Sequence, residues 1–397
     1  MISERARNLS SSETLKITAR AKQMAREGMS VISLSAGEPD FKTPPHICNA
    51  AIEAITDGFH GYTMNTGMPE LREAICAKLK RDNGLDYSPD QIIVSNGAKQ
   101  SIGFAILATI NPGEEVIIPA PYWVSYSEMV KLADGKPVPV KTSFGNGYKL
   151  TTKQLKEAIT KKTRGLILCT PSNPTGACYT REELKELADI LREYPDIKIY
   201  SDEIYEYITF SSGHTGILQA APELQDRTIL INGFSKGFAM TGWRLGYAAG
   251  PKEVISAMAK IQSQETSAPS SISQKAGIAA YNGPLKPVTD MRDEFKKRRD
   301  FVVSELRSIE GVHCFVPAGA FYIFPDIEQF LGKKTPDGEA VKTSTDLCIY
   351  LLEKHGVATV PGDAFGEPNG LRISYATSMD QLKEGLIRIK NGLTALN

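Results

Sequence analysis

Short apolar segments alternate with amphipathic helical segments through the middle of the chain, and this alternation limits the possible folds more than any other feature. The apolar segments have the length and the β-branched residues of strands, whereas the segments between them have helical spacing. Continuous apolar strands separated by helices are typical of a mostly parallel sheet that is covered on both faces. The sequence therefore predicts an α/β fold with such a sheet at its centre.

The predicted strands and helices follow one another closely. Strands are expected at Gln91–Ser95, Glu115–Pro119, Pro137–Lys141, Gly165–Thr170, Ile197–Ser201, Thr228–Ile231 and Leu245–Ala249. Helices are expected at Ala98–Ile110, Val124–Ala133, Thr152–Ile159 and Arg181–Glu193. In sheets of this kind ligands bind beyond the carboxyl ends of the strands, so reactive side chains should follow the strands directly.

The remaining segments predict a second, smaller α+β domain. A charged helical stretch at Pro287–Ile309 looks like a long connecting helix, and the N-terminal helix, about Thr14–Arg26, is expected to pack with the smaller domain. Its other strands and helices are expected at Ala320–Pro325, Ser344–Lys354, Val357–Val360, Leu371–Tyr375 and Met379–Leu393. We expect residues 45–290 to form the large domain, and residues 1–44 and 291–397 to form the small one.

Composition excludes several classes of partner. The chain has 397 residues, with 46 basic and 46 acidic side chains, so no net charge favours nucleic acid or an anionic membrane. Its six cysteines are scattered and lack the spacing of metal ligands, so we expect free thiols and no metal site. Because no apolar run could span a membrane and the first residues lack a signal core, a cytoplasmic location is expected.

The segment Asn232–Arg244 places a lysine between two glycines, directly after a predicted strand. Burying an unpaired ammonium group is costly, so Lys236 needs either solvent or a chemical role. A desolvated lysine loses its proton readily and forms a Schiff base with an aldehyde, and Arg244 could bind a phosphate group. An aldehyde and a phosphate together describe pyridoxal 5′-phosphate. For this segment alone, a surface lysine in a glycine-rich loop is the simpler interpretation.

The ends of other strands carry groups that suit the same cofactor. The segment Asn96–Gln100 opens a helix whose backbone amides could hold a phosphate. Trp123 could stack on a planar ring or could be a core residue, and Asn173 could bond a ring oxygen from an otherwise ambiguous turn. Asp202 would pair with a pyridinium nitrogen, and Tyr205 could reach the ring oxygen. Each signal is weak alone, but together they predict a single cofactor site.

These and further motifs resemble the fold-type I pyridoxal-phosphate enzymes, and specifically the class I aminotransferases, from about Ser10 to Leu393. The motifs are Ala36–Phe41, Tyr62 with Gly67–Arg72, Pro171–Gly176, Ser201–Tyr205, the segment around Lys236, and Gly370–Tyr375. The resemblance implies transfer of an amino group between an amino acid and a 2-oxo acid, with the cofactor bound by the large domain.

The resemblance also implies roles for individual residues around the cofactor. Lys236 would hold the cofactor and carry the proton, and Asp202 would pair with the ring nitrogen. Tyr205 and Asn173 would bond the ring oxygen, while Trp123 would stack on the ring. The phosphate would be surrounded by Ala98, Lys99, Ser235 and Arg244.

Substrate and partner contacts are implied in the same way. Arg372 would clamp the substrate α-carboxylate, with Trp123 and Asn173 also in contact with the substrate and the backbone of Gly37 nearby. Tyr62 would reach the phosphate of a neighbouring subunit, which implies a homodimer with shared active sites.

Within the family, the chain is similar to bacterial aspartate aminotransferases and to bifunctional aspartate/prephenate aminotransferases. Lys99, in the sequence Asn-Gly-Ala-Lys-Gln-Ser, would bind the distal carboxylate of aspartate, glutamate or prephenate, with Thr14 also near the substrate. Alternatively, Lys99 is a phosphate neighbour or a solvated helix residue, and Thr14 is an ordinary helix cap.

Other functions on the same fold stay open. They are an aminotransferase of aromatic or other specificity, a pyridoxal-phosphate-dependent β-lyase, and a non-catalytic regulator that binds the cofactor. Regulators of this kind carry a DNA-binding extension before the aminotransferase module. Here the likeness begins within about the first dozen residues, which disfavours a regulator.

Overall fold

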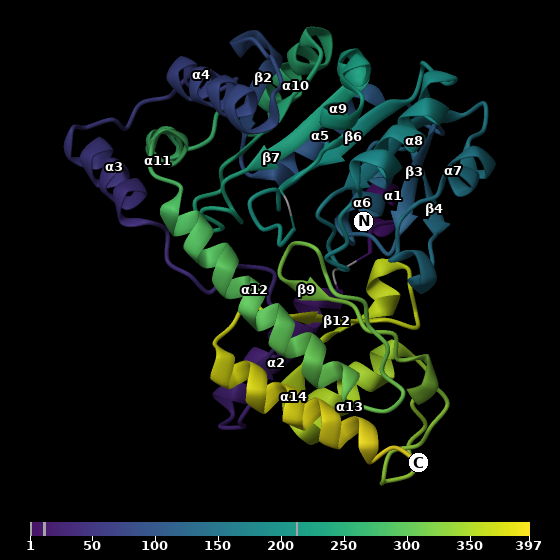
Figure 1. Cartoon of the computed structure of the whole chain (residues 1–397). Helices are drawn as coiled ribbons and strands as arrows, with labels where there is room; N and C mark the ends of the chain where they lie inside the picture. The colour runs from purple at the N-terminus through teal and green to yellow at the C-terminus, as the bar shows by residue number, and fades with distance from the viewer. Residues whose placement is uncertain (1, 11–12, 212) are drawn as a thin grey trace.

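The computed structural model describes residues 2–10, 13–211 and 213–397, without the side chains of residues 13–16 and 18. A seven-stranded sheet with the order β2-β8-β7-β6-β5-β3-β4 occupies the upper part of Figure 1. Its strands are β2 (Ile92–Ser95), β3 (Glu115–Ala120), β4 (Lys136–Lys141), β5 (Thr163–Cys169), β6 (Lys198–Asp202), β7 (Thr228–Gly233) and β8 (Gly246–Ala249). All the strands predicted for this sheet are present, with small differences at their ends.

The sheet is mostly parallel, as predicted, with one exception that affects the site. Strands β3 to β7 pair in parallel, whereas β8 pairs antiparallel with both of its neighbours, β2 and β7. The start of β8, rather than its end, therefore lies at the carboxyl edge of the parallel strands. This reversal brings Arg244, which precedes β8, to the same edge as Lys236, which follows β7.

Helices cover both faces of this sheet. Consecutive residues of one strand, such as Ile93 and Val94, point to opposite faces and belong to different hydrophobic cores, which explains why the strands are continuously apolar. The predicted helices are α5 (Ala98–Thr109), α6 (Ser125–Leu132), α7 (Thr152–Ala158) and α8 (Arg181–Arg192). Helices that the sequence reasoning did not identify are α3 (Pro45–Thr56), α4 (Pro69–Lys78), α9 (Ile217–Ala220), α10 (Lys252–Glu265) and α11 (Ser271–Asn282).

The long helix α12 (Lys286–Arg307) runs from the large sheet to a second group of elements, in the lower part of Figure 1. There α2 (Glu13–Arg26), α13 (Ser344–His355) and α14 (Met379–Thr394) surround two small sheets. The sheets are β1 (Ile32–Ser33) with β10 (Val357–Ala358), and β11 (Val360–Pro361), β12 (Leu371–Ser374) and β9 (Tyr322–Ile323). Ile17 and Met24 of α2 join this core, so the N-terminal helix packs as expected. A short helix, α1 (Glu4–Arg7), precedes α2.

Two strand predictions in this second group are wrong in detail. Of the predicted strand Ala320–Pro325, only Tyr322–Ile323 pairs with another strand. At its start, Ala320 has a φ of 58°, which interrupts an extended backbone. The predicted strand Val357–Val360 is divided between β10 and β11, which belong to different sheets. An apolar run indicates burial, but it does not indicate which sheet takes each residue. Among the described helices, none combines the length and the apolar character needed to cross a membrane.

A buried ion pair joins the end of α4 to the segment after β6. Lys78 has no exposed surface (0%), and its Nζ contacts Oε1 of Glu206 and donates to Oδ1 of Asn83 at 2.7 Å. Nδ2 of Asn83 donates in turn to Oε2 of Glu206 at 3.1 Å. The three side chains form one buried network, and Oδ2 of Asp82 also lies 4.0 Å from Nζ of Lys78, so Glu206 depends on Lys78 for compensation of its charge.

Replacement of Lys78 should show this dependence. Lys78→Met is expected to lower the free energy of unfolding by about 3–5 kcal/mol, because Glu206 becomes a buried charge without a partner. The double variant Lys78→Met/Glu206→Gln should recover much of this loss, since both charges are then absent. Urea denaturation of the three proteins measures both effects. An equal loss in the single and double variants would contradict the explanation.

Candidate active site

The carboxyl edge of the large sheet gathers most of the predicted site residues. Asn173 follows β5, Asp202 ends β6, Lys236 follows β7, and Ala98 begins α5 after β2. Arg372 comes from β12 of the second group, and its Nη1 donates to Oδ1 of Asn173 at 3.1 Å. The site therefore lies between the two groups of elements, with side chains from both.

Lys236 is half-buried, and its surroundings favour the neutral amine. Its Nζ donates to the carbonyl oxygen of Gly37 and lies 5.8 Å from the centre of the Tyr205 ring. Removal from water is the largest cause that lowers the pKa of Lys236 from 10.5 to about 8. A nearby carboxylate opposes this shift, while Arg372 and Arg244 add to it. The neutral amine is the form that attacks an aldehyde.

Asp202 is a buried carboxylate, 4% exposed, held by two hydrogen bonds. The Tyr126 hydroxyl donates to Oδ2 at 2.6 Å, and the backbone N–H of Ile204 donates to Oδ1 at 3.2 Å. Burial raises the pKa of Asp202 to about 6, and the two hydrogen bonds oppose this rise. Among the described residues no cation forms an ion pair with Asp202, so a cationic ring nitrogen would fit there.

Arg372 is a buried cation, 3% exposed, that has no acidic partner among the residues described. Its Nη2 donates to the carbonyl of Ser35 at 2.8 Å, and its guanidinium lies 4.6 Å from the centre of the Tyr322 ring and 5.1 Å from that of Phe365. The Nε atom has no hydrogen-bond partner. Burial lowers the pKa of Arg372. A guanidinium with unused donors in such a place suits the carboxylate of a ligand.

Tyr205 and Asn173 lie close to Arg372. The Tyr205 hydroxyl is 3.1 Å from the Tyr322 hydroxyl, and Tyr205 is 3% exposed. Asn173 uses its Oδ1 on Arg372, whereas its amide NH₂ group has no protein partner in the described part of the chain. These two side chains can therefore still donate to a ligand oxygen.

The start of α5 forms a cradle beside Arg244. Gly97 has a φ of 86°, and a Cβ atom there would lie 2.6 Å from Nη2 of Arg244. A Cβ atom on Gly246 would lie 2.3 Å from the backbone nitrogen of Ala98, so glycine is required at both positions. Arg244 is exposed and donates to backbone carbonyls at 3.0 and 3.1 Å. A helix N-terminus beside such an arginine suits a phosphate group.

Lys99 and Trp123 lie side by side. The Nζ of Lys99 is 5.0 Å from the centre of the Trp123 ring, and that ring packs edge-on against Tyr126 at 5.3 Å. Partial desolvation, and then the charge of Arg244, lowers the pKa of Lys99. Ser235 is buried next to Lys236 in the chain, at 7% exposure.

Two predicted site residues are not placed in the site. Tyr62 is fully exposed (102%), in the segment between α3 and α4 at the left of Figure 1. The side chain of Thr14 lies outside the described residues, so its prediction stays untested.

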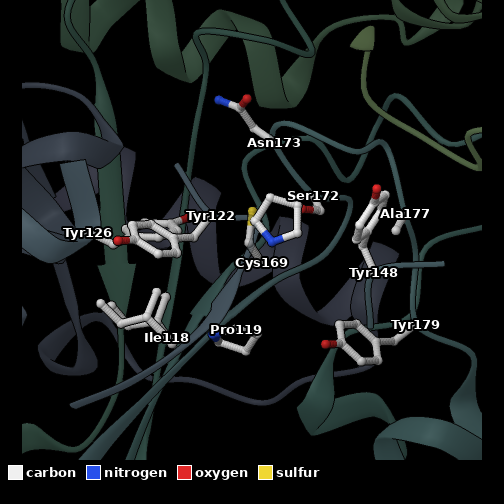
Figure 2. A pocket seen from close by; sticks show the side chains of 12 residues that line it. Ile118, Pro119, Tyr122, Tyr126, Tyr148, Cys169, Ser172, Asn173, Ala177 and Tyr179 are labelled. Carbon is white, nitrogen blue, oxygen red and sulfur yellow. The ribbon is translucent and has the colours of Figure 1, made fainter. Parts of the chain in front are cut away.

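Several residues near the site were missed by the sequence reasoning, above all Tyr126, Tyr322 and Ser35. Figure 2 shows Tyr126 with Cys169 and Asn173 around a small cavity beside the site. None of the missed residues belongs to a recognisable motif. Tyr126 is a buried aromatic residue near the start of a helix, a pattern that more often indicates a core residue.

The amine of Lys236 should titrate well below an ordinary lysine. In protein without any ligand, the rate of reductive alkylation of Lys236 by an aldehyde is expected to rise with pH, with a midpoint at about pH 8, and then to level off. The reason is that the neutral amine, which is the reactive form, predominates above its pKa. Mass spectrometry of the Lys236 peptide measures the rate, and the same lysine in urea-unfolded protein is the control, with a midpoint at about pH 10.4. A common midpoint in both states would contradict the desolvated site.

The chain matches one protein family over most of its length. Residues 29–389 match the aminotransferases of class I and II. The chain is 49% identical to a bifunctional aspartate aminotransferase and glutamate/aspartate-prephenate aminotransferase of Petunia hybrida. The alignment spans 400 residues and covers 100% of this chain and 83% of that protein.

Solved structures give the same result. The crystal structure of an aspartate aminotransferase from Rhizobium meliloti superposes with a TM-score of 0.97, at 48% identity and with 100% of each chain covered. An aspartate aminotransferase from Thermus thermophilus with maleate superposes with a TM-score of 0.92, at 38% identity and with 99% of each chain covered. The chain therefore belongs to the class I and II aminotransferases, a family whose members use pyridoxal 5′-phosphate.

Proposed function

We propose that this aminotransferase moves the amino group of aspartate or glutamate to a 2-oxo acid, either 2-oxoglutarate or oxaloacetate, and that it also converts prephenate to arogenate. The observation that carries the proposal is a pair of cations, Arg372 and Lys99, that have no acidic partners among the described residues. Dicarboxylic substrates present one carboxylate to each cation. The names of the Petunia hybrida relative and of the Thermus thermophilus complex with maleate support dicarboxylic substrates.

Pyridoxal 5′-phosphate fits the groups at the carboxyl edge of the large sheet. Asp202 would pair with the ring nitrogen, Tyr205 and Asn173 would bond the ring oxygen, and Trp123 would stack on the ring. The phosphate would lie among Ala98, Lys99, Ser235 and Arg244, where the start of α5 supplies backbone N–H groups. Lys236 would hold the cofactor through its amine, and the bound cofactor would supply the electron sink for cleavage of the bond between Cα and hydrogen.

Lys236 would move the proton. With a pKa of about 8, its amine is partly neutral near pH 7 and needs little further desolvation to act as a base. It would take the proton from the substrate Cα and return it at C4′ of the cofactor. The carbonyl of Gly37, which accepts a hydrogen bond from Nζ, would hold the amine in place between these two events.

Arg372 would orient the substrate. Its hydrogen bonds to Asn173 and Ser35 fix the plane of the guanidinium, and the remaining N–H groups can bind the α-carboxylate with two parallel hydrogen bonds. Lys99 would bind the distal carboxylate beside Trp123. A substrate held at both ends has its reacting bond in one orientation, which lowers the entropic part of the barrier.

We also propose that the active protein is a homodimer. Tyr62 is fully exposed, and Met64, Ile52 and Ile55 in the same part of the chain expose 55%, 57% and 51% of their surfaces. A second copy of the chain would bury these apolar side chains, and Tyr62 would then reach the phosphate in the partner's site.

The division into domains is part of the proposal. Residues 45–290 would form the domain that binds the cofactor, and residues 1–44 and 291–397 the small domain that carries Arg372. The long helix α12 supports this division, as does a hydrophobic core made mostly of residues outside 45–290, although that core also includes Ile204, Tyr205 and Ile208 of the large domain. Movement of one domain towards the other would bring Arg372 onto the substrate.

Replacement of Lys236 tests the catalytic proposal. Lys236→Ala is expected to lower steady-state amino transfer by at least about 10²–10⁴-fold, because both proton transfers lose their acid–base group. Coupled assays with aspartate and 2-oxoglutarate measure the rate. Turnover within tenfold of wild type, roughly 1.4 kcal/mol in the barrier, would overturn the role of Lys236.

The roles of Arg372 and Lys99 should be distinguishable by the amino acids that each variant affects. Arg372→Ala is expected to raise KM for every amino acid, because all of them carry the α-carboxylate. Lys99→Ala should reduce kcat/KM for aspartate about 10–100-fold, the cost of a lost charge-assisted hydrogen bond, and should affect phenylalanine much less. Steady-state kinetics of each variant with both amino acids supply the comparison. Equal losses for aspartate and phenylalanine in Lys99→Ala would count against its role.

A further inference from the structure

We propose that Tyr126 is a positioning residue that keeps Asp202 ionised and correctly oriented for the ring nitrogen of the cofactor. This inference rests on the proposed function, since it concerns the acid that would hold that nitrogen. The central observation is the 2.6 Å hydrogen bond from the Tyr126 hydroxyl to Oδ2 of Asp202. Both side chains are buried, with 2% and 4% of their surfaces exposed.

Tyr126 reaches Asp202 from a different element. It lies in the first turn of α6, whereas Asp202 ends β6, so the hydrogen bond fixes the helix and the strand relative to each other. The ring of Tyr126 packs edge-on against Trp123, with ring centres 5.3 Å apart and an angle of 89°. One side chain thus contacts both the acid for the ring nitrogen and the indole proposed to stack on the ring.

The carboxylate depends on this hydroxyl. Oδ1 of Asp202 accepts from the backbone N–H of Ile204, and Tyr126 is the one side chain with a hydrogen bond to Asp202 among the described residues. Without the hydroxyl, Oδ2 would lie buried with an unsatisfied charge. A hydrogen bond to the charged form lowers the pKa of an acid, so the hydroxyl opposes the rise to about 6 that burial causes.

Other titratable groups surround Asp202 and do not replace Tyr126. Glu203, the residue that follows β6, raises the pKa of Asp202, whereas Lys236, which follows β7, lowers it. Cys169 of β5 lies beside both Tyr126 and Asp202, and Figure 2 shows Tyr126 and Cys169 at the same cavity. Burial raises the pKa of Cys169, so its thiol stays neutral, and this thiol donates to a backbone carbonyl at 3.4 Å. Asp202 is therefore the charged acceptor available to the Tyr126 hydroxyl.

The consequence concerns the charge of the ring nitrogen. A carboxylate stabilises a protonated pyridine nitrogen, whereas a neutral carboxylic acid does not. If Asp202 became protonated near neutral pH, the cofactor would lose its ion pair and part of its electron-withdrawing power. Tyr126 would then affect the reaction without contact with substrate or cofactor, through the protonation state of Asp202 alone.

The test compares Tyr126→Phe with a matched control, Tyr148→Phe. Tyr148 is also buried, at 7% exposure, and lines the same cavity, but it makes no hydrogen bond to Asp202. Infrared spectra of the full-length protein as a function of pH follow the C=O band of protonated Asp202, assigned by its loss in Asp202→Asn. The midpoint is expected near pH 6 in wild type and in Tyr148→Phe, and about one unit or more higher in Tyr126→Phe. The same midpoint in all three proteins would overturn the proposal.

The loaded enzyme gives a second readout. In Tyr126→Phe, kcat is expected to fall about tenfold and the acid limb of its pH profile to move upward, while KM for aspartate changes less than about twofold because Arg372 and Lys99 are intact. The cofactor dissociation constant should rise. In an Asp202→Asn background, Tyr126→Phe should have no further effect. A loss of the same size in both backgrounds would show that Tyr126 acts by packing alone.

Two precautions keep the outcomes distinct. If wild type does not transfer amino groups, the proposed function fails, but the infrared titration still decides whether Tyr126 controls Asp202. If Tyr126→Phe does not fold, the tyrosine C–O band is compared between wild type and Asp202→Ala, which removes the acceptor of the hydrogen bond. A band at the same frequency in both proteins would contradict the hydrogen bond.

Discussion

The structure depends on charged groups that are held away from water without counter-charges of their own. Asp202 and Arg372 are each almost fully buried, and the described residues offer neither an ion pair, while Lys236 is desolvated enough to lower its pKa to about 8. Leaving charges in this condition costs stability. Lys78 and Glu206 neutralise each other inside the same protein, whereas Asp202 and Arg372 do not. This contrast favours a ligand as the source of their counter-charges. An anionic substrate and a cofactor with a cationic ring nitrogen would supply the missing partners.

The topology explains how these groups meet. Parallel strands bring Asn173, Asp202 and Lys236 to one edge of the sheet, because each lies at or just beyond the end of its strand. The antiparallel strand β8 adds Arg244 by placing its start at that same edge. Glycines at positions 97 and 246 then allow α5 and the arginine to approach closely. Helix α12 and the second group of elements complete the site from the other side with Arg372.

Much of this arrangement could be predicted from the sequence, and the failures have physical causes. The strands of the large sheet were identifiable because they are buried on both faces and therefore continuously apolar. Helix α3 has no comparably clear pattern, since Ile52 and Ile55 are exposed, so its apolar residues are not confined to the buried face. The residues at strand ends were identifiable by position and chemistry. Tyr126 was not, because its hydrogen bond to Asp202 joins residues 76 positions apart and leaves no local pattern.

A half-reaction tests the proposed amino transfer most simply. The protein loaded with pyridoxal 5′-phosphate is mixed with one amino acid at a time, and the cofactor absorbance reports its conversion to the amine form. Prephenate is then added to the converted enzyme. We expect conversion by aspartate and glutamate, followed by reversal with prephenate. Conversion without reversal would remove prephenate from the proposal. If neither aspartate nor glutamate converts the cofactor, the proposed amino transfer is contradicted, and a β-lyase, an aminotransferase of another specificity or a regulator is favoured instead.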